Sequence, residues 1–198
     1  MWGRNWGQKL VHAQYDNEKR IERREFFDLN EFLRPRRDAS FCYSIPSTDP
    51  LRCCIVKIGI YVMDLGLISR VGRSFSHHYI GMETECGVNF TIEKNTDCIL
   101  LQSCGRPALG RHPIVWMKRD GVDRKHLDSL KNVTEDAMQL PHDANVLNIV
   151  EWINGRNEAN EPYSLTESNC QHFAQSLWTY LTKKEYPNPS KFQPTFCK

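Results

Sequence analysis

The residue that most clearly suggests catalytic chemistry is Cys170, which lies in the segment YSLTESNCQHFAQSLWTYL, residues 163–181. Ser168 is a suitable N-cap and Gln171 follows three residues later, so the pair predicts a capping box and a helix start beside the cysteine. A helix N-terminus carries partial positive charge and unpaired N–H groups, which favour a thiolate and lower the pKa of a cysteine. With a base nearby, Cys170 is a candidate nucleophile; the alternative is a small buried core cysteine.

A nucleophilic cysteine needs a general base, and histidine is the usual one. Of the seven histidines, only His77 and His78 lie in the middle of a predicted hairpin strand. Adjacent strand residues face opposite sides of a sheet, so we expect only one of the two to face Cys170. We prefer His78, because it shares the more apolar side of the strand with Ile80 and Met82. His77 is the alternative.

The base must be held in one tautomer by a third polar group. The next strand offers Thr91 and Glu93 on one face, roughly opposite His78 or one diagonal away. Glu93 is our preferred third residue, because a carboxylate accepts the imidazole N–H and stabilises the imidazolium. Thr91 is the alternative, as is a solvent-facing Glu93 with no role in the site. His172 lies on the helix of Cys170 but is expected to point away from it, as a structural donor.

The elements that must position these residues run strands first and helices second. Runs of β-branched and aromatic residues around turn signals predict strands over Cys53–Met63, Phe75–Thr84, Val88–Lys94, Asp97–Ser103 and Ile114–Lys118. Helical periodicity predicts helices over Asp123–Val133 and Asn145–Asn154, before the helix that begins beside Cys170 and ends near Lys183. This order indicates an α+β fold, in which an antiparallel sheet packs against helices.

The 198 residues predict one domain with appendages. We expect a charged N-terminal arm over residues 1–40, a folded domain over 41–185 and an irregular tail over 186–198. Aromatic residues between charged runs predict a short amphipathic helix in the arm: Phe26, Phe27, Leu29 and Phe32. That helix is either a solvated arm or a basic aromatic segment that contacts anionic lipid or a partner.

Composition excludes several function classes. A net charge of +2 is too small to indicate nucleic-acid binding, and no apolar run has the length of a membrane span. The N-terminus lacks the apolar core of a signal peptide, so we expect a cytoplasmic protein. The eight cysteines contain no CxxC pair, which favours reduced thiols and argues against a structural zinc site; no cofactor is expected.

The segment Tyr163–Phe173 closely resembles the Asn-Cys-x-His-Phe motif of the lecithin:retinol acyltransferase family, and His78–Met82 looks like that family's histidine strand. The resemblance covers about residues 53–183 and implies the circularly permuted NlpC-like papain fold, in which the histidine precedes the cysteine. In one respect the chain departs from the family. The family's second strand usually carries another histidine about a dozen residues after the first, where this chain has Asn89, Phe90 and Thr91.

The resemblance implies a cysteine-dependent acyltransferase or phospholipase-like hydrolase of lipid metabolism, with Cys170 as nucleophile and His78 as general base. It implies a lipid or acylated substrate, with peripheral membrane contact through the arm. A thiol peptidase or isopeptidase acting on a polypeptide is the second enzymatic alternative. A non-catalytic interaction module with a degenerate site is the alternative from another class.

Overall fold

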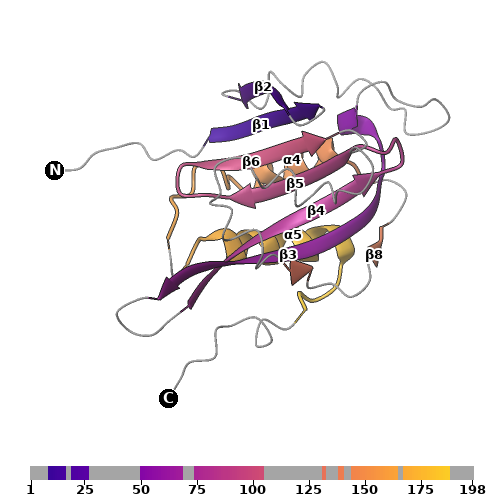
Figure 1. The fold of residues 1–198 in the computed structure, drawn as a ribbon. Coiled ribbons are helices and arrows are strands. Elements are labelled where there is room, and N and C mark those ends of the chain that lie inside the picture. The colour runs from indigo at the N-terminus through magenta and orange to yellow at the C-terminus, as the bar shows by residue number, and fades with distance from the viewer. Residues whose placement is uncertain are drawn as a thin grey trace.

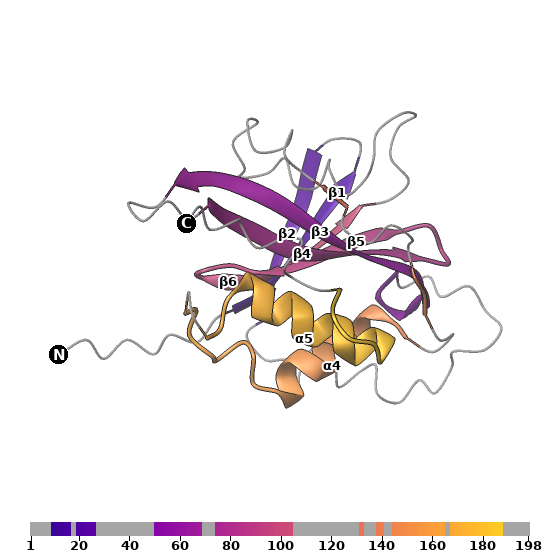
Figure 2. The same ribbon diagram turned by 90° about the horizontal axis from the view of Figure 1, so that it is seen from below.

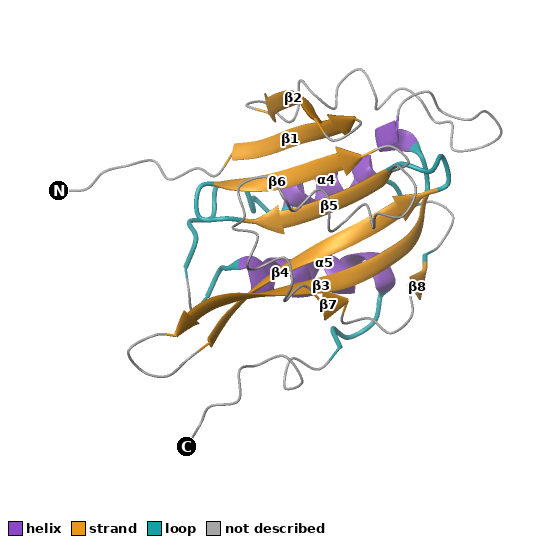
Figure 3. Ribbon diagram, viewed as in Figure 1, coloured by secondary structure: helices purple, strands orange, loops and turns teal. Residues whose placement is uncertain are grey.

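The computed structural model of the chain describes residues 9–16, 19–26, 50–68, 74–104, 131–132, 138–140, 144–164 and 167–187. Its strands are β1 (Lys9–Asp16), β2 (Lys19–Phe26), β3 (Ile55–Ile68), β4 (Ser74–Thr84), β5 (Asn89–Lys94), β6 (Cys98–Cys104), β7 (Lys131–Asn132) and β8 (Met138–Gln139). A 3-10 turn, η1 (Pro50–Arg52), and two α-helices, α4 (Val146–Gly155) and α5 (Cys170–Thr182), complete the set (Figure 3).

One mixed sheet forms the centre of the molecule (Figure 1). Seven of its eight strands run in the order β2-β1-β6-β5-β4-β3-β7, and the eighth, β8, also pairs with β3. The pairs from β3 to β6 are antiparallel neighbours, whereas β1 runs parallel to β6. Strands β3 and β4 continue beyond the end of β5 (Figure 1). The α+β class expected from the sequence is therefore confirmed, whereas the sheet expected to be antiparallel is mixed, because β1 pairs in parallel with β6.

Both helices cover the same face of the sheet (Figure 2). Successive strand side chains face opposite sides of the sheet, so alternate residues point toward the helices. These residues are fully buried. The apolar core is built from Ile58, Ile60, Ile80, Met82, Phe90, Ile92, Ile99 and Leu101 of the strands and Ile149, Val150, Ile153, Phe173, Ala174 and Leu177 of the helices. Each large buried aliphatic or aromatic side chain contributes about 1.5–3 kcal/mol through the hydrophobic effect.

Local sequence signals account for most of this core. The expected hairpin forms between β4 and β5, and Gly87 supplies the positive φ of 79° that its turn requires. Helix α4 begins at the capping box of Asn145 and Asn148 and buries the apolar face expected from its periodicity. Strands β3 to β6 match the expected strands to within a few residues at each end.

The N-terminal segment differs from the expected helical arm. Residues 9–16 and 19–26 are strands, and β1 pairs with β6, which buries Leu10 and Val11. Without β1, this side of β6 would be an open sheet edge with unpaired backbone groups. Pairing with a strand about 90 residues away thus makes this part of the arm a piece of the sheet, while the amphipathic helix expected from Phe26 to Phe32 falls almost wholly outside the described residues. Residues 27–40 of the arm lie outside the described residues.

Two other expectations concern the segment between β6 and α4. Lys131 and Asn132 are in strand β7, paired with Val62 and Tyr61, so the helix expected over 123–133 is wrong at its end. The rest of that helix and the strand expected at 114–118 lie outside the described residues, as does the tail from residue 188 onward. Neither α4 nor α5, the two α-helices that the structure describes, has the length and apolar character of a membrane-spanning helix.

Candidate functional site

Cys170 is the first residue of α5, as the sequence predicts, but the N-cap is Asn169 rather than Ser168. The Asn169 Oδ1 accepts the backbone N–H groups of Gln171 and His172 at 2.9 and 3.2 Å. Asparagine caps helices as well as serine does, so the helix start shifts by one residue at little cost. Cys170 is 4% exposed and lies on the buried face of the helix.

The sulfur of Cys170 lies at the edge of the sheet rather than above one of its faces. It is 4.0 Å from the carbonyl oxygen of Ser76 and accepts a hydrogen bond from the backbone N–H of His78. Strand β5 pairs with β4 only from Ile80 onward, so the earlier part of β4 is not paired with β5. Helix α5 therefore presents its first side chain to strand backbone groups that β5 leaves open.

The imidazole that hydrogen-bonds with the Cys170 side chain is that of His77, not that of His78. His77 also contacts a carboxylate: its Nε2 is hydrogen-bonded to the Oε2 of Glu93. Nδ1 is then the ring nitrogen that remains for the sulfur. Our expectation of His78 assumed a nucleophile packed against one face of the sheet. A sulfur at the sheet edge is within reach of side chains from either face of the sheet. The histidine that faces the helices is therefore not necessarily the one that contacts Cys170.

His78 does face the helices, as predicted, but it occupies a different environment. Its Nδ1 is 2.9 Å from the Tyr186 hydroxyl and its Nε2 is 3.1 Å from the Ser76 hydroxyl. Burial, reinforced by the neighbouring His77, lowers the pKa of His78 to about 4. His78 is thus a neutral, buried ring at neutral pH, with both ring nitrogens within hydrogen-bond distance of hydroxyl groups. This geometry does not support the base role that the sequence assigned to it.

The segment that carries Tyr186 follows α5 and is tied back to it. Trp178 donates its indole N–H to the carbonyl oxygen of Glu185 at 3.2 Å. Helix α5 itself ends at Thr182, and its C-cap Lys183 adopts the left-handed conformation with φ 57°. This anchored turn holds the Tyr186 ring over the His78 ring, with centroids 6.4 Å apart.

Glu93, the third residue preferred from the sequence, is hydrogen-bonded to His77 rather than to His78. The Glu93 side chain is 4% exposed, and it lies at the end of β5 on the same face as His77. Thr91, the alternative, donates its hydroxyl to the Gln102 Oε1 at 3.2 Å within the sheet. The structure thus brings together Cys170, His77 and Glu93, and it leaves Thr91 in a separate hydrogen bond.

The environment of Cys170 favours the thiolate. Burial alone raises the pKa of its thiol, but hydrogen bonding to His77, the His77 charge, the His78 N–H and the Tyr163 hydroxyl together outweigh burial, so the pKa lies below its ordinary value. The Tyr163 hydroxyl donates to the sulfur at 3.8 Å. Burial and the negative charge of Cys170 raise the pKa of Tyr163 to about 12, so this phenol remains a hydrogen-bond donor at neutral pH.

A buried lysine holds the loop that leads to Cys170. Lys94 is fully buried at the end of β5, and its Nζ is 2.8 Å from the Ser168 hydroxyl and 3.4 Å from a carboxylate oxygen of Glu158. The same Nζ is 3.4 Å from the half-exposed Glu161. A buried cation must be paired, so this cluster holds Glu158 and Ser168 against the strand that carries Glu93.

The sequence pattern gives no indication that Lys94 and Tyr163 lie near Cys170. Lys94 ends an ordinary strand, and its anionic partner Glu158 lies 64 residues later in the chain. Tyr163 precedes Cys170 by seven residues in a loop, so no helical or strand period relates them. His77 was identifiable as one of two candidates. His172 behaves as expected: it is exposed, and its Nδ1 is 3.0 Å from the Asn169 side-chain oxygen that caps the helix.

The site has the parts of a nucleophilic centre: a sulfur with a lowered pKa, an imidazole beside it and a carboxylate behind the imidazole. Among the residues that the structure describes, no group of three or more histidine, cysteine or carboxylate side chains is arranged to hold a metal ion. Comparisons of the chain with protein-family models, with curated proteins and with solved structures find no match.

Proposed function

We propose that this chain is a cysteine-dependent acyltransferase or hydrolase, with Cys170 as nucleophile, His77 as general base and Glu93 as the residue that orients His77. One observation carries the proposal: the Cys170 sulfur, the His77 imidazole and the Glu93 carboxylate form a continuous chain of hydrogen bonds. A nucleophile, a base and an orienting group in this arrangement are what acyl transfer requires.

In the first step, the thiolate of Cys170 attacks the carbonyl carbon of an ester or amide, and the thiol proton resides on His77. Glu93 accepts the Nε2–H of His77, which stabilises the imidazolium and holds one tautomer. Negative charge develops on the carbonyl oxygen, and the backbone N–H of Cys170 stabilises it there, since Asn169 already accepts the N–H groups of Gln171 and His172. The tetrahedral intermediate then collapses, and His77 protonates the leaving alcohol or amine.

In the second step, the acyl group is removed from the Cys170 sulfur. The uncharged His77 takes a proton from water or from an acceptor hydroxyl or amine, whose oxygen or nitrogen attacks the thioester. A second tetrahedral intermediate releases the product acid, ester or amide and restores the thiolate–imidazolium pair. The choice between hydrolysis and transfer depends on whether water or an acceptor reaches the thioester first.

The proposed fold is the circularly permuted NlpC-like papain fold of the lecithin:retinol acyltransferase-like family. A histidine strand comes first, a polar residue follows on the next strand, and the cysteine comes last at a helix start. Glu93 stands in for the histidine expected on the second strand of that family. This proposal carries with it an acyl lipid as the first substrate class and peripheral membrane contact through residues 1–40.

Two alternatives make different predictions. A thiol peptidase or isopeptidase of the same fold takes its acyl group from a polypeptide. A non-catalytic interaction module is favoured by one observation, the 4% exposure of Cys170, which leaves little of the residue open to a substrate. Both alternatives are outcomes of the experiment below.

The test uses p-nitrophenyl esters of short and medium-length acyl chains and of a blocked amino acid, each incubated with the full chain. Tryptic cleavage gives a peptide over residues 157–183 in which Cys170 is the only cysteine, so mass spectrometry detects acylation there directly. We expect an acyl adduct on this peptide in the wild-type protein and none in Cys170→Ala. Faster reaction of the longer acyl chains supports the lipid class, and faster reaction of the amino-acid ester supports the peptidase.

Iodoacetamide provides a separate measurement that does not depend on substrate choice. We expect the alkylation of Cys170, followed on the same peptide, to have its midpoint below the ordinary cysteine pKa of about 8.5. A midpoint at or above that value, with no acyl adduct from any ester, would contradict the enzyme proposal and favour the interaction module.

A further inference from the structure

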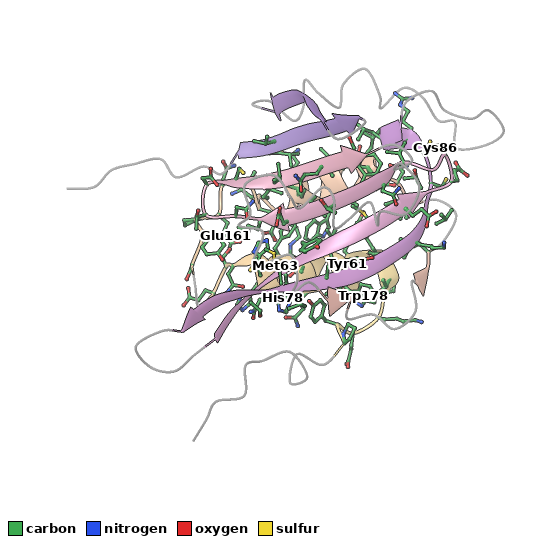
Figure 4. The ribbon with its side chains drawn as sticks, in the orientation of Figure 1. Tyr61, Met63, His78, Cys86, Glu161 and Trp178 are labelled. Carbon is green, nitrogen blue, oxygen red and sulfur yellow. The ribbon has the colours of Figure 1, made fainter. Side chains whose placement is uncertain are left out.

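A pair of thiols, those of Cys53 and Cys86, lies at the opposite end of the sheet from Cys170. Strands β3 and β4 pair Ile55 with Thr84, and one residue further the Glu85 N–H donates to the Cys54 carbonyl oxygen at 2.9 Å. One more step in this register brings Cys53 opposite Cys86. Figure 4 shows Cys86 at one end of the sheet and His78 well away from it.

The side chains of Cys53 and Cys86 are in contact. Their side chains are hydrogen-bonded to each other, and the Cys86 backbone N–H also donates to the Cys53 sulfur. The Thr84 hydroxyl lies 3.2 Å from the Cys86 sulfur and fixes its position beside the turn. Residues directly opposite in an antiparallel pair have Cα atoms about 4.5–5.5 Å apart, which is within the range that a disulfide spans.

The two cysteines differ in accessibility. Cys86 is exposed at the tip of the β4–β5 turn, whereas Cys53 is 1% exposed. Both residues are thiols in this structure. An exposed thiol meets a dissolved reagent first, and a buried thiol in contact with it is placed to react second. This is the arrangement of an attacking and a resolving cysteine.

We propose that Cys53 and Cys86 form a reversible disulfide site whose oxidant is a low-molecular-weight disulfide such as oxidised glutathione. The Cys86 thiolate attacks one sulfur of the small disulfide and releases one thiol, which gives a mixed disulfide on Cys86. The Cys53 sulfur then attacks the Cys86 sulfur and displaces the second thiol. Two cysteine thiols are oxidised, one small disulfide is reduced, and the two protons leave with the two released thiols.

Ring closure is the slow step of this sequence. Burial, the hydrogen bond to Cys86 and the Cys86 charge raise the pKa of Cys53 to about 12, so little thiolate is present at neutral pH. The contributions from Cys86 charge end once Cys86 is bonded to the small thiol, while the effect of burial remains. The mixed disulfide therefore accumulates first, and its conversion to the internal disulfide becomes faster as the pH rises.

The internal disulfide joins the start of β3 to the turn after β4, the strand that carries His77. A disulfide across such a loop reduces the conformational freedom of the unfolded chain. We expect the oxidised protein to unfold at a temperature about 5–10 °C higher than the reduced protein. Because the site is remote from Cys170, it does not depend on the function proposed above.

The test incubates the full folded chain in mixtures of reduced and oxidised glutathione, followed by blocking with iodoacetamide and tryptic cleavage without reductant. The expected product links the peptide of residues 53–57 to the peptide of residues 74–94, in which Cys86 is the only cysteine. Fragmentation between the adjacent Cys53 and Cys54 identifies the bonded residue. Cys54→Ser is the matched control and retains the link, whereas Cys86→Ser abolishes it.

Three results would overturn the proposal. One is no linked peptide in the wild-type protein at any glutathione ratio, and another is a link to Cys54 rather than Cys53. The third is equal linkage of Cys53 and Cys54 in the folded protein and in urea, which would show that the fold does not select the pair. Cys86 is exposed, so Cys86→Ser is expected to fold and keeps the comparison valid if Cys53→Ser does not.

Discussion

Two buried cysteines at opposite ends of one sheet have opposite acid–base character. Cys170 is 4% exposed and Cys53 is 1% exposed, so burial raises the pKa of both thiols. For Cys170 the neighbouring groups reverse that effect, and its pKa falls below the ordinary value. For Cys53 the neighbours add to burial, and its pKa rises to about 12.

The difference lies in what surrounds each sulfur. Cys170 meets an imidazole, a phenol and a backbone N–H, all of which donate hydrogen bonds to a thiolate. Cys53 meets a second thiol and the charge of Glu85, which oppose a negative charge on its sulfur and outweigh the hydrogen bond from the Cys86 backbone N–H. Burial alone therefore does not make a cysteine inert. The hydrogen-bond donors and charges around its sulfur decide whether the thiolate is stable.

The two ends also differ in how polar side chains are held. Near Cys170, the strand lysine Lys94 is fully buried against Glu158, while near Cys53 the strand lysine Lys57 pairs with Glu83 at the surface. Buried ionic groups lose hydration and need their partners, whereas surface pairs exchange with water. We therefore expect substitutions at the Cys170 end to have larger effects than matched substitutions at the other end.

The largest effect is expected for His77→Gln. The glutamine amide keeps a donor near Glu93 but cannot accept the Cys170 proton, so the rate of acyl-adduct formation on Cys170 should fall by about 10²–10⁴-fold. The same variant should raise the midpoint of Cys170 alkylation, because the hydrogen bond and charge of His77 both lower that pKa. Mass spectrometry of the 157–183 peptide gives both quantities.

His172→Gln is the control for this substitution, since His172 is exposed on the same helix and its imidazole hydrogen-bonds to the cap residue Asn169. Its acylation rate should stay within about two- to threefold of wild type. If His77→Gln reacted as fast as His172→Gln, His77 would not be the base, and the difference between the two ends would have to come from backbone donors alone.

A second comparison sets Lys94→Met against Lys57→Met. Lys94→Met removes the buried cation beside Glu158 and leaves that carboxylate only the exposed Arg156, so we expect a loss of about 2–3 kcal/mol in the free energy of unfolding. Lys57→Met removes only an exposed pair, at a cost within about 0.5 kcal/mol. Urea unfolding at pH 7 measures both values. Equal losses would show that the two ends are held in the same way.

The sequence predicts the parts of this molecule that depend on local periodicity. Strands β3 to β6, helix α4 and the start of α5 follow from runs of apolar residues and from capping side chains. Strands β1 and β2 do not, because their place in the sheet depends on the open side of β6, far away in the chain. A charged segment without alternation gives no sign of such pairing.

The site was predictable to the same extent. Cys170 follows from the helix start, and Glu93 from the strand that pairs with the histidine strand. The sequence does not show that His77 rather than His78 lies beside Cys170, because this depends on where β5 stops pairing with β4. Hairpin patterns set which face a residue occupies but not how far a neighbouring strand extends.

The smallest effect concerns the other histidine of the pair. The pKa of His78 is about 4 in the folded protein and about 6.5 when unfolded, so the unfolded chain binds a proton between these values and the folded chain does not. Its contribution to stability is therefore present above pH 6.5 and is lost as the pH falls. Between pH 7.5 and 5 this amounts to about 2 kcal/mol.

His78→Gln should flatten this dependence, and His172→Gln should preserve it. The groups around His78 are the hydroxyls of Ser76 and Tyr186 and the neighbouring His77. All three remain in His78→Gln, so the difference in slope between the variants isolates His78. Urea midpoints at pH 5, 6 and 7.5 give the slopes. At the other end of the sheet, Cys53 with its pKa of about 12 contributes nothing in this range, so an unchanged slope in His78→Gln would place the acid-sensitive group elsewhere.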